Sequence, residues 1–249
     1  MAGCATLPET ELLSRDQAEQ ASQSFKRMIS RQKLCGCCVD ANAVVRYDST
    51  FMSGTIDGIV QAMAPSYLKF VGLNPIGQPV LILNTNGSSF QFIIAVEKKG
   101  YQGPVQSEQF RKYAPPGIDG GFGYYWLIGK LQPGAIGIDD IRQDARGRGL
   151  WVELHYESKE LAHHVLFDPE RQMIMEHILR EPGGDIVLDV RYDGYIDSSC
   201  ALPGRVTISS GNHKGVLEIV LSDWDRVQTF TEQEFYFELP PDFEQVNVQ

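Results

Sequence analysis

Long apolar runs are missing from this chain of 249 residues, and so is an excess of positive charge. No run approaches the about 18 apolar residues that a spanning helix needs, so we do not expect the chain to cross a membrane as a helix. Lys and Arg number 22 against 32 Asp and Glu, which gives a formal net charge of −10. Because such a mean field repels a phosphate backbone, nucleic acid is not expected as a partner.

The sequence also lacks the short motifs of common enzyme classes. It has no G-x-S-x-G elbow, no Gly-rich phosphate loop and no H-E-x-x-H pair. Asp139 and Asp140 are adjacent carboxylates in a polar segment that offers no evident acid or base partner. We therefore predict that the protein is not an enzyme and needs no cofactor. A hydrolase assembled from residues distant in the sequence stays open as an alternative.

Cysteine is sparse, and the first of the five cysteines stands in a distinctive context. Cys4 follows Ala2 and Gly3, which match the small-residue box before the lipidated cysteine of a bacterial lipoprotein, although the charged and apolar regions of a signal peptide are absent. We predict that Cys4 carries the lipid and that residues 1–15 form the anchor and tether. Ala5, at the position where Asp would signal retention, favours the outer membrane. An ordinary disordered terminus is the alternative.

The remaining cysteines do not form a metal-ligand pattern. Cys35, Cys37 and Cys38 would alternate between the two faces of a strand and would not converge on one ion. Small buried thiols are the ordinary interpretation of these residues. A disulfide to Cys200 is plausible in an oxidising periplasm, although spacing alone does not select the pair.

The histidines give no ligand spacing either. His163 and His164 are adjacent on an expected strand, so their side chains would point to opposite faces. His155 and His177 are isolated in the sequence. We expect surface or edge positions for the histidine pair and predict no metal site.

One helix and a long series of short strands are expected along the chain. Residues 16–30 carry apolar side chains at spacings of three and four, which predicts a helix, and from residue 34 the period changes to two. This order predicts a mainly-β antiparallel meander that forms a single domain over residues 16–249. Short helical segments are expected at 107–113 and 122–131. Further strands are expected at 52–63, 66–71, 78–83, 90–96, 149–157, 160–167, 173–180, 185–192, 204–209, 216–224 and 235–239.

Four short segments stand in order along the chain: the Cys4 box, the Asn-Pro-Ile-Gly loop within residues 67–77, the Trp-Leu-x-Gly segment within 125–133, and the stretch 192–224 that ends in Trp. In this order they resemble the LolB-like outer-membrane lipoprotein receptors of the LolA/LolB carrier fold. The resemblance implies a half-open antiparallel β-barrel with an N-terminal helix and a helical lid. The chain departs from this pattern in its cysteine-rich first strand and in a tail after residue 224.

The resemblance also implies two kinds of site. An apolar cavity for acyl chains needs a concave lining rather than reactive groups, and ordinary core is the alternative for each lining residue. The loop Asn74, Pro75, Ile76 and Gly77 is similar to a membrane-insertion loop, with Ile76 at its tip; the alternative is that Ile76 folds back onto the sheet. The predicted lining residues are Val39, Ala43, Val45, Phe70, Leu81, Leu83, Phe92 and Ile94, with Tyr124, Trp126 and Leu127 on the lid.

The function implied by this resemblance is lipoprotein transport at the periplasmic face of the outer membrane. A lipid-anchored protein of this kind would take the acyl chains of lipoproteins from a soluble periplasmic carrier and help insert them into outer-membrane lipid. Each buried CH₂ contributes about 0.8 kcal/mol, so a few acyl chains suffice for binding. The alternative is a structural or assembly lipoprotein that uses the same fold to bind another envelope protein.

Overall fold

The computed structural model shows a chain that divides into two compact units, each built around β-structure. One unit comprises residues 1–35 and 129–216, and the other comprises 36–128 and 217–249. The single domain expected over residues 16–249 stays a prediction. The structure describes residues 8–33, 35, 38–49, 53–108, 110, 123–157, 161–196, 200, 202–210, 215–225 and 229–249.

The first unit holds helix α1 and seven strands. The strand order is β1-β8-β9-β10-β11-β12-β13, and every neighbouring pair is antiparallel. The strands are β1 Thr10–Leu12, β8 Ile136–Asp144, β9 Leu150–Tyr156, β10 Ala162–Asp168, β11 Met173–Arg180, β12 Ile186–Asp193 and β13 Arg205–Ser209.

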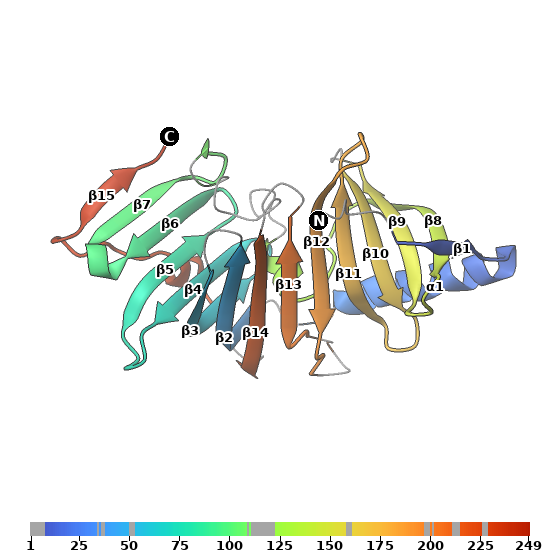
Figure 1. Ribbon diagram of the computed structural model, residues 1–249, viewed down its shortest axis with the longest axis horizontal. Coiled ribbons are helices and arrows are strands. Elements are labelled where there is room, and N and C mark those ends of the chain that lie inside the picture. Colours follow the sequence, from blue (N-terminus) through green and yellow to red (C-terminus); the bar gives the residue numbers. More distant parts are fainter. Residues whose placement is uncertain are drawn as a thin grey trace. The chain divides into compact units, whose positions relative to one another are not determined.

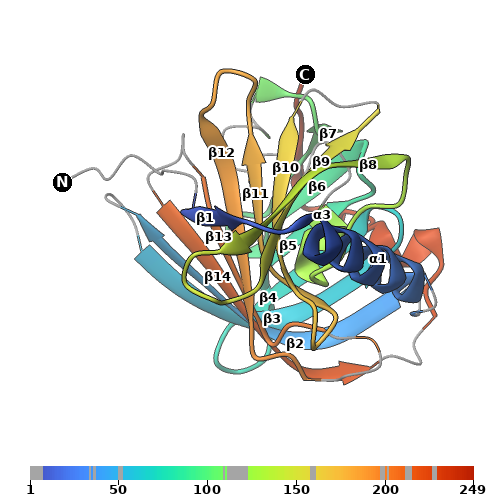
Figure 2. The same ribbon diagram turned by 90° about the vertical axis from the view of Figure 1, so that its right-hand side faces the viewer.

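Helix α1 (Arg15–Gln32) confirms the helix predicted from the apolar spacing. Its first turn is closed by a capping box, in which Ser14 and Gln17 each bond the other's backbone N–H. Its apolar stripe is buried at Phe25 and Met28, and the ring of Phe25 meets that of Phe167 edge-on at 5.3 Å. Figure 2 shows α1 lying across the strands of this unit, and its apolar stripe packs into the core of the unit.

The second unit holds eight strands and the short helix α3 (Gly123–Leu127). The strand order is β14-β2-β3-β4-β5-β6-β7-β15; β2 to β7 pair antiparallel, whereas β15 lies parallel to β7 (Figure 1). The strands are β14 Gly215–Asp225, β2 Cys38–Ser49, β3 Ser53–Met63, β4 Tyr67–Leu73, β5 Pro79–Thr85, β6 Ser89–Ile94, β7 Lys99–Pro104 and β15 Glu244–Asn247.

The mainly-β, antiparallel prediction is confirmed, with corrections in individual elements. The strand expected at 235–239 is wrong: the 3₁₀ turn η2 (Glu232–Phe235), which has a capping box between Thr231 and Glu234, ends at Phe235, and residues 236–239 form neither helix nor strand. Strands β1, β7, β8 and β15 were not expected. Of the residues expected in the helical lid, 111–122 lie outside the described residues. Within 123–131 the helix α3 ends at Leu127, and the lid stays a prediction.

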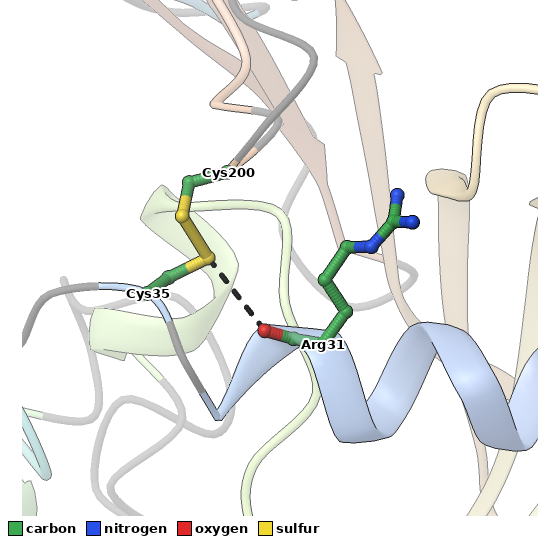
Figure 3. The surroundings of a disulfide bond; sticks show 3 residues. All are labelled: Arg31, Cys35 and Cys200. Carbon is green, nitrogen blue, oxygen red and sulfur yellow. Dashed lines mark hydrogen bonds between the residues drawn. A yellow bond between two sulfur atoms is a disulfide. The ribbon is translucent and has the colours of Figure 1, made fainter.

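A disulfide joins Cys35, just after α1, to Cys200 in the connection between β12 and β13 (Figure 3). The two Cα atoms are 5.7 Å apart, and the sulfur of Cys35 lies 3.9 Å from the carbonyl oxygen of Arg31. This is the pairing that spacing alone left open. Cys38 is disulfide-bonded as well. Cys4 and Cys37 lie outside the described residues.

Among the described residues, no helix combines the length and apolar character needed to span a membrane.

Candidate functional site

The apolar residues predicted from the strands share one face of the second unit's sheet. Val60 pairs with Phe70, Phe70 with Leu83, and Leu83 with Phe92, so one row crosses four strands. Directly paired residues in an antiparallel sheet lie on the same face. We call this surface the lining face; its predicted members are Val39, Ala43, Val45, Phe70, Leu81, Leu83, Phe92 and Ile94.

The lining face is only partly covered. Val39, Ala43 and Phe70 are buried, with exposed fractions of 4%, 3% and 9%. The other five predicted members are half-buried: Val45, Leu81, Leu83, Phe92 and Ile94. Apolar area that stays in contact with water can still be covered by a ligand, at about 25 cal/mol per Å². The face therefore offers an apolar ligand a surface that ordinary core would already have filled.

The described part of the expected lid is packed rather than open. Tyr124, Trp126 and Leu127 on α3 are 3%, 1% and 4% exposed. Burial raises the pKa of the Tyr124 phenol far above its usual range, so this group stays neutral. Ordinary core residues would be buried to the same extent, so this burial does not distinguish a lid from core packing. The role of the three residues in a lid stays a prediction.

The loop between β4 and β5 presents Ile76 to solvent. The side-chain oxygen of Asn74 accepts hydrogen bonds from the backbone N–H groups of Ile76 and Gln78, at 3.1 and 2.9 Å. Gly77 has a φ of +79°, a conformation that glycine adopts without strain. Ile76 is 78% exposed, so it does not fold back onto the sheet. Its role in membrane insertion stays a prediction.

A second exposed aliphatic side chain lies at the same end of this sheet. Val96, in the turn between β6 and β7, is also 78% exposed. Leu81 pairs with Ile94, so the turn after β6 and the loop before β5 lie at the same end of the sheet. An aliphatic side chain at a loop tip contributes little to folding but can contact a membrane or a partner.

The histidines of the first unit lie where the sequence did not place them. His163 and His177 are 0% and 1% exposed, with His163 Nδ1 2.9 Å from His177 Nε2, and His164 is 9% exposed. The expected surface or edge position is wrong, because β10 lies between β9 and β11. Burial, together with the neighbouring histidines, lowers the pKa of His177 well below its usual value. In the described part of the chain, no three potential ligand side chains are grouped to hold a metal.

This burial predicts a loss of stability in acid. Folded His177 resists protonation, whereas unfolded His177 takes a proton near its ordinary pKa of about 6.5, so unfolding is favoured as the pH falls below that value. The free energy of unfolding should fall by up to about 1.4 kcal/mol per pH unit more in the wild type than in His177→Gln. Urea titrations between pH 8 and 5 measure this difference, with exposed His155→Gln as the control. If the free energy of unfolding changed with pH equally in the wild type and in H177Q, this prediction would be contradicted.

Buried carboxylates in the first unit belong to a network of arginine pairs. Burial alone would raise the pKa of Asp144, but hydrogen bonds from Arg148 and Trp151 outweigh it and lower this pKa to about 2. Glu176 accepts from Arg148 and Arg191, at 3.1 Å each. Perturbed carboxylates can mark active sites, yet these are paired within a salt-bridge network, which is sufficient reason for the shift.

The carboxylates at 139 and 140 have partners that the sequence did not reveal. Asp139 lies 2.7 Å from Nδ1 of His155, and Asp140 accepts a 2.6 Å bond from Arg142. All four side chains are 42–53% exposed. Because exposed ion pairs contribute little free energy, these contacts are surface pairs rather than a built acid–base site.

Comparison with known proteins supports the fold. No protein-family model matches the chain, and no curated protein matches it. It is similar to the structure of a LolA superfamily protein from Nitrosomonas europaea, with a TM-score of 0.54 at 10% identity over 86% of this chain and 97% of that one.

Two further structures give the same result. A candidate outer-membrane lipoprotein-sorting protein domain from Vibrio parahaemolyticus has a TM-score of 0.54 at 9% identity, over 89% of this chain and 97% of that one. A DUF1329 family protein from Desulfovibrio piger has a TM-score of 0.56 at 7% identity, over 87% and 97%. The chain therefore has a fold like that of the LolA superfamily, and the likeness gives no specific LolB assignment.

Proposed function

We propose that this protein is a lipid-anchored lipoprotein of the outer membrane, which binds the acyl chains of other lipoproteins and helps insert them into that membrane. The half-buried apolar lining face carries this proposal, because five of its predicted members stay partly open to solvent. Binding would run on apolar burial alone, with no cofactor and no catalysed reaction. A soluble periplasmic carrier would deliver the cargo.

The exposed loop supports the second half of this proposal. Ile76 and Val96 offer aliphatic side chains at one end of the same sheet that carries the lining face. Such side chains can enter a bilayer interface, where burying one of them contributes about 1.5–3 kcal/mol. Cargo held on the lining face would then lie in the unit that touches the membrane.

Two neighbouring valines on β2 test acyl binding. Val44 and Val45 are both half-buried but point to opposite faces, and Val45 belongs to the lining face. Val45→Gln should weaken binding of a fluorescent fatty acid roughly 5- to 10-fold, since a polar amide replaces apolar contact area worth about 1 kcal/mol or more. Val44→Gln should leave the affinity unchanged.

The outcome separates this function from the alternative. Equal affinities for the two variants would contradict acyl binding at the lining face. If the wild type binds no fatty acid at all, an assembly protein that uses this fold to hold another envelope protein becomes the better proposal. Thermal melts of both variants check that each is folded.

A further inference from the structure

Residues 229–239 of the C-terminal segment pack on the face of the second unit's sheet opposite the lining face. Gln91 on that face exchanges two hydrogen bonds with the backbone of Phe237, at 3.0 and 2.9 Å. Gly100 has no side chain, and Leu239 packs in the space that a Cβ atom on residue 100 would need. The segment then continues as β15 beside β7 (Figure 1). The tail that the lipoprotein-carrier pattern does not require is thus an ordered part of this unit.

A groove of about 440 Å³ is lined by residues of both the tail and the sheet. This volume is within the range of about 300–1,000 Å³ that holds small ligands. Among the described residues that line the groove there is no lysine, arginine or histidine, and the one acidic residue is Glu232. Five of its lining side chains are carboxamides: Asn84, Asn86, Gln91, Gln102 and Asn247.

One buried acceptor in this lining has no partner. The backbone of Phe237 orients the amide of Gln91, because its N–H donates to Oε1 and its carbonyl accepts from Nε2. Oε1 of Gln91 also accepts a hydrogen bond from Nδ2 of Asn84, at 3.3 Å. The side-chain amide of Asn84 therefore cannot be flipped without losing this bond. Its own Oδ1 is therefore directed elsewhere and has no hydrogen-bond partner among the described residues, although Asn84 is only 2% exposed.

An unpartnered buried acceptor is unfavourable, and the group it lacks is a donor. Asn84 lines the groove, and the carboxamides of this lining can donate hydrogen bonds to hydroxyl groups and accept them from hydroxyl groups. An anion is disfavoured, because the lining offers no cation to pair with it. These requirements describe a neutral ligand that is rich in hydroxyl groups.

Aromatic rings supply the other half of the recognition chemistry. Tyr67 and Phe235 line the groove with ring centroids 5.4 Å apart, and Tyr236 is 65% exposed beside them. Ring faces of this kind can pack against the apolar C–H face of a sugar.

We propose that this groove is a second binding site of the protein, which takes a neutral oligosaccharide. Saturation-transfer NMR with maltotriose and with chitotriose tests it on the full-length protein. At least one of these probes should receive saturation and bind in the millimolar range. Tyr236→Ala, which removes an exposed ring and should not affect folding, should weaken that binding roughly 5- to 10-fold.

Two further variants make the result specific. Asn84→Leu removes a lining carboxamide and should also weaken saccharide binding, and a denaturation curve checks that this variant is folded. Tyr47→Ala changes a half-buried ring on the lining face of β2 and should leave saccharide binding unchanged. No saturation of either probe, or equal binding by the wild type and Y236A, would overturn the proposal. Fatty-acid binding by Y236A should stay normal, so failure here and failure of acyl transport are distinguishable.

Discussion

Ile76→Glu should slow the delivery of a lipidated peptide from this protein to lipid vesicles roughly 10- to 100-fold. The side chain is 78% exposed, and its entry into a bilayer interface contributes about 1.5–3 kcal/mol, which corresponds to that range of affinity. A carboxylate at the same position also resists leaving water. The measurement follows a fluorescent diacylated peptide from the wild type or the variant to vesicles of phosphatidylethanolamine and phosphatidylglycerol.

The control for this experiment is an exposed aliphatic residue that belongs to the other unit. Leu12 on β1, in the first unit, is 81% exposed, so Leu12→Glu adds the same charge to a comparable position. Binding of the peptide before vesicles are added should be equal in all three proteins, because Ile76 is not part of the lining face. Unchanged delivery by I76E would remove the loop from the mechanism, whereas slow delivery by L12E as well would point to a general effect of charge.

Replacing both Cys35 and Cys200 with serine should lower the free energy of unfolding by about 2–4 kcal/mol. The bond joins residues 165 positions apart, so it excludes many extended conformations from the unfolded chain. It also holds the end of α1 to the connection that follows β12 within the first unit. Denaturation in guanidinium, followed by circular dichroism, measures the change.

A reducing agent supplies the matched control. Reduction should destabilise the wild type by at least as much as the double substitution, since Cys38 is also disulfide-bonded. The double variant should respond less to reduction than the wild type does. A variant as stable as the oxidised wild type would show that this bond does not contribute to stability.

The residues of the lining face could be predicted from the sequence, because the alternation of side chains along a strand is a local property. Side chains alternate across a strand, so Val39, Ala43 and Val45 had to share a face once residues 38–49 were extended. The same alternation predicts that His163 and His164 point to opposite faces of their strand. The spacing of apolar residues by three and four predicts the helix α1. The exposed position of Ile76 was one of two outcomes that the Asn-Pro-Ile-Gly turn allowed. Its hydrogen bonds to Asn74 show which one holds.

Other features depend on partners that are far apart along the chain. His163 meets His177 only because β10 and β11 form a hairpin in one particular register. Asp139 reaches His155 across another hairpin, and nothing in either segment alone indicates that contact. Strand β7 contains Gly100 and Gly103, which favour loops, and it becomes a strand because β6 and β15 pair with it.

The sequence by itself therefore determined the β class, the first helix and the sidedness of the apolar strands, since each follows from periodicity within one element. Only the tertiary structure decided the partner of Cys35, the burial of the histidine pair and the path of the tail over the sheet. These depend on which distant segments meet, and the free energy of such meetings comes from burial and hydrogen bonds that no local pattern records. The groove beside Asn84 exists for that reason alone.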